Sequence, residues 1–228
     1  MKVSEIFCSI QGEGGLTGVV SVFVRLAGCH LRCHWCDTPY ALERNGGKTM
    51  GVEDVIEQVS GYDCRYVVVT GGEPMIAEGL GELLEGLSAA GKHITIETAG
   101  TRYREVICDL ASVSPKLSHS TPWQGKYAAF AQGHEKTRLN IDAIRSFIDN
   151  HDYQLKFVVQ GREDLEEIEA ILARLGQVDR SKVLLMPEAT TRTQHRRTGR
   201  QVAHLCREHG FRYCRRVQIE LWGNRRGT

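Results

Sequence analysis

The sequence lacks the features that mark several broad classes of protein. It has only five prolines in 228 residues and no low-complexity or Pro/Ser-rich stretch, so no linker indicates a second domain. We therefore expect one domain over residues 1–228. Neither sign of charge is in excess, because 29 Lys and Arg residues face 28 Asp and Glu residues, for a net charge of +1. No overall field favours nucleic acid or an acidic membrane surface, so a small anionic ligand has to be bound by local charges.

Long apolar runs are also absent. No stretch is long enough to span a bilayer, and the first ten residues, MKVSEIFCSI, are too mixed for the apolar core of a signal peptide. We expect a cytoplasmic protein, whose reducing surroundings keep thiols free for metal binding. Single cysteines at Cys8, Cys64 and Cys108 are interpreted as buried free thiols. The same interpretation is preferred for Cys206 and Cys214, with a second metal cluster as the alternative.

Three of the eight cysteines lie together in the segment R-L-A-G-C-H-L-R-C-H-W-C-D-T-P-Y, residues 25–40. Their spacing is C-x3-C-x2-C, at Cys29, Cys33 and Cys36. Three thiolates can converge on one metal centre, but they neither complete a tetrahedral zinc site nor satisfy the four irons of a cubane cluster. One position is left for a substrate or cofactor, which indicates chemistry rather than a structural role. The alternatives are a zinc knuckle with His30 or His34 as fourth ligand and a chance cluster of thiols.

Strand-like and helix-like segments alternate along the chain. Strands are predicted at residues 19–26, 66–70, 93–97, 110–114, 154–160 and 182–186. Helices are predicted at residues 52–60, 80–90, 141–149 and 164–175, the last ending at Gly176. This alternation predicts an α/β fold with a parallel sheet and right-handed crossovers, either open or partly closed into a barrel.

In such sheets the ligand site lies beyond the carboxyl ends of the strands. The segments at those positions are unusual: T-G-G-E-P at 70–74, E-T-A-G-T at 97–101, S-P-K at 114–116 and M-P-E at 186–188. Each alone is an ordinary turn. Their joint position after successive strands indicates one shared site.

The cysteine spacing, the aromatic Trp35 before the last cysteine and the G-G-E-P segment together resemble the radical S-adenosylmethionine (radical SAM) superfamily. The resemblance implies a partial, modified radical SAM (β/α) barrel of parallel strands. It implies that the three cysteines hold a 4Fe-4S cluster whose fourth iron takes S-adenosylmethionine. It places cofactor contacts at Trp35, Cys36, Asp37, Gly72, Glu73, Ser114, Pro115, Lys116, Gln154, Lys156 and Phe157, with the G-G-E-P contact chiefly from backbone. The L-K-F-V-V segment around Lys156 also has the pattern of an ordinary buried strand.

A more specific resemblance rests on S-I-Q-G-E-G-G at 9–15, F-V-R-L-A-G-C at 23–29, C-D-T at 36–38 and the terminal I-E-L-W-G-N-R-R-G-T. These segments are similar to the 7-carboxy-7-deazaguanine synthase family, which acts in queuosine and deazapurine biosynthesis. The resemblance implies a homodimer that converts 6-carboxy-5,6,7,8-tetrahydropterin to 7-carboxy-7-deazaguanine. It places substrate contacts at Ile10, Gln11, Gly12, Glu13, Arg25 and Thr70, and a Mg²⁺ ligand at Thr38.

The reaction implied is reductive cleavage of S-adenosylmethionine, hydrogen abstraction from the pterin, and ring contraction with loss of ammonia. The cofactor carries this chemistry, so no side chain is nominated as a strong acid or base. The residues themselves fit the substrate in part, because Arg25 can form a bidentate pair with a carboxylate. By position alone, the alternative for Arg25 is a surface charge at a strand end, and the alternative for Thr38 is a helix cap or turn residue.

Two other functions remain open at this point. A glycyl-radical activating enzyme shares the cysteine spacing and G-G-E-P, whereas a small iron-sulfur or zinc module would mediate electron transfer or protein contacts. The reduced cluster needs an electron donor of the flavodoxin or ferredoxin type, and the basic segment 191–209 is a candidate contact for it. The loop 118–138 is either a lid or simply mobile.

Overall fold

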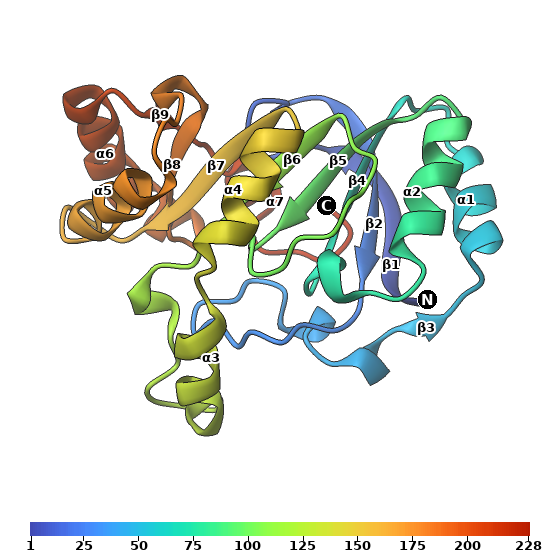
Figure 1. The fold of residues 1–228 in the computed structure, drawn as a ribbon, viewed down its shortest axis with the longest axis horizontal. Helices are drawn as coiled ribbons and strands as arrows, with labels where there is room; N and C mark the ends of the chain where they lie inside the picture. The colour runs from blue at the N-terminus through green and yellow to red at the C-terminus, as the bar shows by residue number, and fades with distance from the viewer.

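The computed structural model describes all residues, 1–228, as a mixed α/β fold (Figure 1). The strands are β1 (Lys2–Ile10), β2 (Val20–Leu26), β3 (Lys48–Thr49), β4 (Tyr66–Gly71), β5 (His93–Thr98), β6 (Leu110–Val113), β7 (Tyr153–Val159), β8 (Val183–Pro187) and β9 (Arg212–Tyr213). The helices are α1 (Val52–Ser60), α2 (Leu80–Ala89), α3 (Ala131–Thr137), α4 (Ile141–Asn150), α5 (Asp164–Leu175), α6 (Arg192–His209) and α7 (Val217–Trp222). The strands and helices predicted from the sequence are confirmed to within one residue at almost every end.

All strands belong to one sheet with the order β3-β1-β2-β4-β5-β6-β7-β8-β9. From β2 to β9 every neighbouring pair is parallel, as predicted. The pairs β1–β2 and β1–β3 are antiparallel, and β1 was missed by the sequence analysis. Its side chains are mostly half-buried, so its apolar periodicity is weak. The strand nevertheless positions the site, because the segment that follows it enters the concave side of the sheet.

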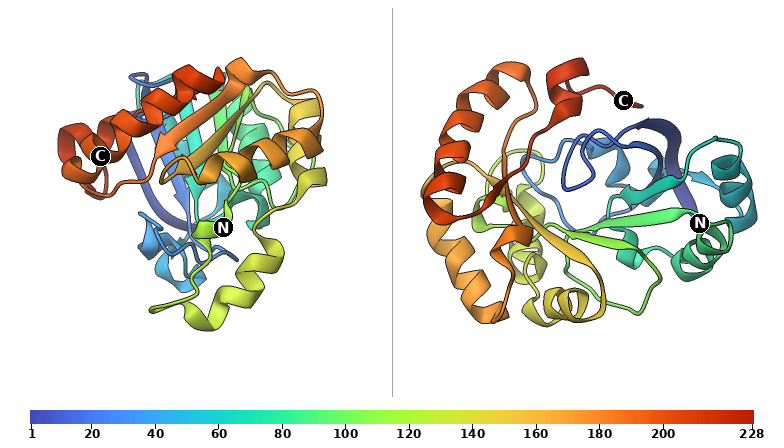
Figure 2. Two further views of the ribbon diagram at one scale, coloured as in Figure 1. Left: turned by 90° about the vertical axis from the view of Figure 1, so that its left-hand side faces the viewer. Right: turned by 90° about the horizontal axis from the view of Figure 1, so that it is seen from above.

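The sheet is curved, and its two sides differ. Figure 2 shows α1, α2, α4, α5 and α6 arranged along the outer side, with the strands inside this arc. The curvature resembles that of a barrel. The edge strands β3 and β9 do not pair with each other, so the barrel is not closed. None of the helices combines the length and the apolar character that a membrane span needs.

Strand β7 illustrates how the sequence builds these two sides. Because side chains alternate along a strand, Leu155 and Phe157 point toward the helices, into a cluster of 36 buried apolar residues. Gln154 and Lys156 point the other way, into the concave side, and both are buried. The strand is thus apolar on its outer face and polar on its inner face. Strands β4, β5 and β6 repeat this with Thr70, Glu97 and Ser112 on the inner face.

Candidate functional site

The concave side of the sheet contains a cavity of about 520 Å³ at the carboxyl ends of β2, β4, β5, β6 and β7. It collects side chains from segments far apart in the chain: the loop after β1, the loop after β2, the strand ends and the C-terminal segment. Of the predicted site residues, it is lined by Ile10, Gln11, Gly12, Glu13, Arg25, Cys29, Cys33, Trp35, Cys36, Asp37, Thr38, Thr70, Gly72, Ser114, Lys116 and Lys156. Glu73, Pro115, Gln154 and Phe157 do not line it.

The loop after β2 presents its three cysteines to this cavity. Cys33 is buried, and Cys29 and Cys36 are partly buried beside it. Arg32 stabilises the loop, because its guanidinium donates to the carbonyl oxygens of Cys29 (2.6 Å) and Leu31 (2.9 Å). The loop is therefore a formed structure before any ligand is added.

Segment 118–138, left open by the sequence, holds this loop from outside. The backbone amide of Arg32 donates to Nδ1 of His134 in α3 at 3.0 Å, and Nε2 of His134 is 3.0 Å from the Ser120 hydroxyl. The amide of His34 donates to the carbonyl oxygen of Ser120 at 2.9 Å. Burial lowers the pKa of His134 to about 4, with Arg138 acting in the same direction against Glu135. A neutral imidazole thus joins α3 to the cysteine loop.

The donor set fits an iron-sulfur cluster better than a zinc knuckle. No three His, Cys, Asp or Glu side chains are placed to hold one metal ion, the three cysteines included. Nε2 of His30 lies 2.9 Å from the Thr101 hydroxyl, so this histidine does not complete a four-ligand set. Thiols spread around a cavity match a cluster whose irons occupy separate corners. Burial raises the pKa of the Cys29 and Cys36 thiols to about 12, so iron has to displace protons when it binds.

The G-G-E-P segment brings the end of β4 against the start of the cysteine loop. A Cβ atom on Gly72 would lie 2.1 Å from the carbonyl oxygen of Gly28, so only glycine allows this approach. The amide of Glu73 donates to the same oxygen at 2.9 Å. The Glu73 carboxylate points away from the cavity and accepts from the Thr98 hydroxyl (2.7 Å) and the Ala99 amide (2.8 Å). Glu73 therefore fixes the turn, while the Gly72 backbone faces the cavity.

Trp35 and Lys116 form one wall of the cavity. The Trp35 indole donates to Nδ1 of His119 at 3.1 Å. The Lys116 ammonium lies 5.7 Å from the centre of the Trp35 ring and donates to the backbone and hydroxyl oxygens of Ser114, both at 2.9 Å. The S-P-K segment thus presents a cation beside an aromatic face. Pro115, between Ser114 and Lys116, is buried and does not line the cavity.

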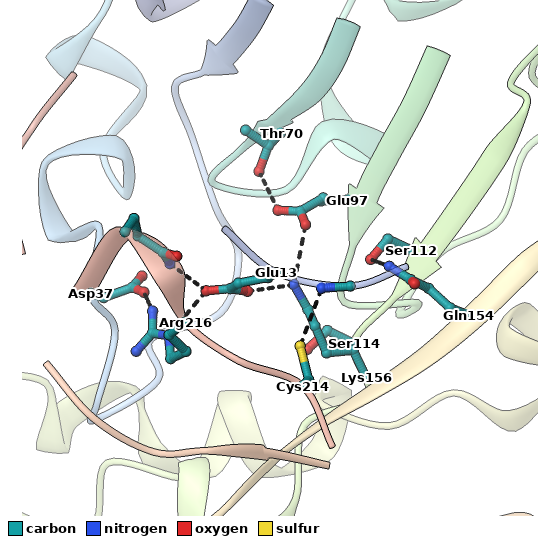
Figure 3. A network of polar contacts seen from close by, with 12 residues as sticks. Glu13, Asp37, Thr70, Glu97, Ser112, Ser114, Gln154, Lys156, Cys214 and Arg216 are labelled. Carbon is teal, nitrogen blue, oxygen red and sulfur yellow. Dashed lines mark hydrogen bonds and ion pairs between the residues drawn. The ribbon is translucent and has the colours of Figure 1, made fainter. Parts of the chain in front are cut away.

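Glu13 is the centre of a buried charge network (Figure 3). It accepts hydrogen bonds from Lys156 (2.6 Å), Arg216 (3.0 Å) and Gln218 (2.7 Å). Burial alone would raise the pKa of Glu13, but the Lys156 ammonium and the Arg216 guanidinium lower it well below its usual range. The same contacts raise the pKa of Lys156 against the effect of burial, with Glu97 contributing. All three groups are therefore charged at neutral pH.

The network extends in two directions. Lys156 also donates to Glu97 at 3.1 Å, and Glu97 accepts from the Thr70 hydroxyl at 3.3 Å. On the other side Arg216 pairs with Asp37, directly after the last cysteine of the loop. One continuous chain of contacts therefore joins the predicted substrate residues to the predicted cofactor residues.

Gln154 supports the loop that carries Glu13. Its side-chain oxygen accepts from the Gly15 amide (2.8 Å), and its amide nitrogen donates to the Ser112 hydroxyl (2.9 Å). Sγ of Cys214 accepts from the Gly14 amide at 3.2 Å. Cys214 is thus a lone thiol beneath this loop, and Cys206 lies in the helix-side core, so the two do not form a second cluster.

Arg25 lines the cavity and is not a surface charge, because its side chain is only 16% exposed. Its Nε donates to Glu5 at 2.7 Å, and Glu5 also accepts from the Tyr40 hydroxyl (2.8 Å) and from Arg226 (3.0 Å). Thr38 precedes a short 3₁₀ turn, Pro39–Ala41, as the turn interpretation predicts. Its hydroxyl donates to Asp37 at 3.0 Å and does not cap the turn, which leaves two oxygens side by side at the cavity wall.

Phe157 corrects one prediction. Its side chain is fully buried in the helix-side core, so it does not reach the cavity. The reason is strand alternation: Lys156 faces inward, so its neighbour has to face outward. Conversely, sequence reasoning missed Glu97, Arg216 and Gln218 as members of the network. The position of Glu97 at the end of a strand was a signal for that residue, whereas Arg216 and Gln218 lie just before the family-like segment, which begins at Ile219.

Comparisons with known proteins agree with this geometry. The model of the radical SAM superfamily matches residues 24–121. The 7-carboxy-7-deazaguanine synthase of Rhodopirellula baltica is 42% identical over 229 residues, covering 100% of this chain and 89% of that protein. The protein of the same name from Halobacterium salinarum is 41% identical, covering 98% and 91%. The crystal structure of QueE from Escherichia coli has a TM-score of 0.69 and 27% identity, and the match covers 93% of this chain and 92% of that one.

Proposed function

Because this chain belongs to the 7-carboxy-7-deazaguanine synthase family of the radical SAM superfamily, we propose that it converts 6-carboxy-5,6,7,8-tetrahydropterin to 7-carboxy-7-deazaguanine, with ring contraction and loss of ammonia. It is a radical SAM enzyme of deazapurine and queuosine biosynthesis. The observation that carries the assignment is that three thiols and a buried charge network share one cavity of about 520 Å³. A cavity of this size suits a bicyclic small molecule. The relatives do not favour a glycyl-radical activating enzyme.

The cofactors of such an enzyme are a 4Fe-4S cluster, S-adenosylmethionine and Mg²⁺. When bound, the cluster and S-adenosylmethionine supply the one-electron chemistry of the reaction. We propose that Cys29, Cys33 and Cys36 hold the cluster, and that the adjacent oxygens of Thr38 and Asp37 offer Mg²⁺ the hard ligands it prefers. The wall formed by Gly72, Trp35, Ser114 and Lys116 is the proposed binding surface for S-adenosylmethionine.

The other half of the cavity is the proposed substrate site. Arg25 is a nearly buried cation whose Nε is held by Glu5, and its terminal guanidinium nitrogens are proposed to pair with the substrate carboxylate, a stronger interaction where water is excluded. Glu13 is held ionised and in place, so it offers an acceptor to the donor-rich edge of a pterin. Ile10, Gln11, Gly12 and Thr70 complete this surface. The roles proposed for these residues are orientation and exclusion of water rather than proton transfer.

We further propose that the chain acts as a single domain, assembles as a homodimer and works in the cytoplasm. Leu221 and Trp222 of α7 leave apolar side chains exposed, which supports self-association. A cluster held by three cysteines needs them reduced, which a reducing compartment favours. Reduction of the cluster is assigned to a carrier of the flavodoxin or ferredoxin type.

The test is anaerobic reconstitution with iron and sulfide, reduction, and addition of S-adenosylmethionine, Mg²⁺ and carboxytetrahydropterin, with mass spectrometry of the products. Cys33→Ala should lose both the bound iron and carboxydeazaguanine formation. Cys206→Ala is the matched control, because this thiol is also buried but lies outside the cavity, and it should retain both. Formation of 5'-deoxyadenosine without carboxydeazaguanine would show a radical SAM enzyme with another substrate. An inactive protein with a full iron complement would contradict the assignment.

A further inference from the structure

A second cavity, of about 650 Å³, lies beside the cysteine loop, where α3, α4 and α5 meet. We call it the basic cavity. His30, the residue after Cys29, forms part of its wall. The remaining basic lining comes from other segments, and Asp142 is the one carboxylate among the lining residues. The basic residues of the lining are His30, Arg102, Lys136, Arg145 and Arg174.

The charges of the basic cavity are not neutralised within the chain. Arg102, Lys136 and Arg174 are exposed, and none of them pairs with a carboxylate. Cations elsewhere near the cysteine loop do pair: Arg138 contacts Glu167, for example. The first turn of α4, after its cap Asn140, also lines the basic cavity and adds the partial positive charge of a helix N-terminus. Cations that line one cavity reinforce one another where they lie within a Debye length, about 8 Å at physiological ionic strength.

Exposed aromatic side chains lie on the segment that leads into α3. Phe130 is 51% exposed, and its ring lies 5.1 Å from the guanidinium of Arg32 in the cysteine loop. Trp123, in the same segment, is 61% exposed. Aromatic residues and arginine are enriched in the cores of protein–protein interfaces. Exposed aromatic side chains thus precede α3, and the end of the same helix contributes Lys136, an unpaired cation, to the basic cavity.

We propose that the basic cavity and Phe130 form the docking surface for an acidic one-electron carrier protein, an inference that rests on the proposed function. Cys206 and Cys214 lie in different parts of the core and do not form a second cluster site, so each electron for the cluster is proposed to arrive from outside. In the step assigned to this surface, the reduced carrier loses one electron and the cluster gains one, with no covalent bond formed or broken. The position of His30 brings a docked carrier to the loop that holds the cluster ligands.

The sequence predicts a second candidate docking surface, the basic segment on α6. This segment is positively charged, but it lies away from the cysteine loop. Arg196 and Arg197 are exposed. Figure 1 shows α6 against β8 and β9 at one end of the sheet, whereas the loop between β2 and β3 lies below its centre, near α3. Charge steers an encounter, but transfer requires a short path to the cluster. Charge-reversing variants of the two surfaces should therefore differ in their effect on carrier binding.

The experiment compares two variants with the same change in charge, Arg102→Glu/Lys136→Glu in the basic cavity and Arg196→Glu/Arg197→Glu on α6. The affinity of cluster-loaded protein for oxidised flavodoxin, as an acidic probe, is measured at low and high salt. We expect the first variant to weaken binding by about tenfold or more at low salt and to lose most of the salt dependence, because like charges now face each other. The second variant should bind as wild type does.

A second readout separates docking from catalysis. With dithionite as chemical reductant, the Arg102→Glu/Lys136→Glu variant should form product at the wild-type rate, since these exposed residues lie outside the active cavity. Wild-type affinity in this variant, or loss of affinity in the α6 variant instead, would overturn the docking surface. Absence of product from wild type with dithionite would overturn the proposed function, while the binding measurement would still decide the docking surface.

Discussion

Two carboxylates, the buried Glu73 and the nearly buried Glu13, are held in opposite ways. Glu73 sits behind the cysteine loop and accepts hydrogen bonds from the neutral donors Thr98, Ala99 and Met75, and burial raises its pKa. Glu13 lines the cavity itself, where two cations lower its pKa against the effect of burial. The comparison shows that one half of the site is fixed by neutral hydrogen bonds and the other by paired charges. Charges are thus concentrated where the anionic substrate is proposed to bind.

Removal of the central cation should have the largest effect. Lys156→Met leaves Glu13 and Glu97 without their shared partner, in a position where the lysine is only 4% exposed. Breaking a buried ion pair on one side costs about 3–5 kcal/mol, so urea denaturation should show a loss of that order, together with loss of product formation. The double variant Lys156→Met/Glu13→Gln should recover part of the stability without activity. Unchanged stability in Lys156→Met would mean that the network carries no structural role.

Glu73→Gln should have a smaller effect, because its partners are neutral. The amide keeps one acceptor but leaves one of the buried donors, such as the Ala99 amide, without a partner. A lost buried hydrogen bond costs about 1–3 kcal/mol, and urea denaturation measures this directly. If Glu73→Gln lowered the free energy of unfolding as much as Lys156→Met does, the neutral and the charged half of the site would not differ in how they are stabilised.

The sequence predicted those parts of the site that consist of short contiguous segments, and it missed contacts between residues far apart in the chain. The cysteine loop, G-G-E-P and S-P-K are short segments at strand ends, and the structure brings them to one cavity. The alternation of side chains along β7 is enough to exclude Phe157 from the cavity when Lys156 faces it. The family resemblance nevertheless predicted both residues as cofactor contacts. The contact between Glu13 and Arg216 joins residues 203 positions apart, so no local pattern could indicate it. Strand β1 was missed because only one of its side chains is fully buried.

A further predicted effect concerns pH and the neutral half of the site. His134 has its pKa lowered from 6.5 to about 4 chiefly by burial, so the unfolded chain binds a proton that the folded chain does not. The free energy of unfolding should therefore be fully supported above about pH 6.5 and should decline as the pH falls toward 4. His134→Gln should flatten this decline, with exposed His204→Gln as the control. Equal slopes in both variants would show that His134 is not held neutral.

The most direct test of the divided site is a pair of binding measurements on anaerobic, cluster-loaded protein. Glu13→Gln removes a charge from the half assigned to the substrate, and Lys116→Met removes one from the half assigned to S-adenosylmethionine. We predict that Glu13→Gln weakens carboxytetrahydropterin binding by about tenfold or more with S-adenosylmethionine binding unchanged, and that Lys116→Met does the reverse. If each variant weakened both ligands equally, the cavity would not be divided between cofactor and substrate.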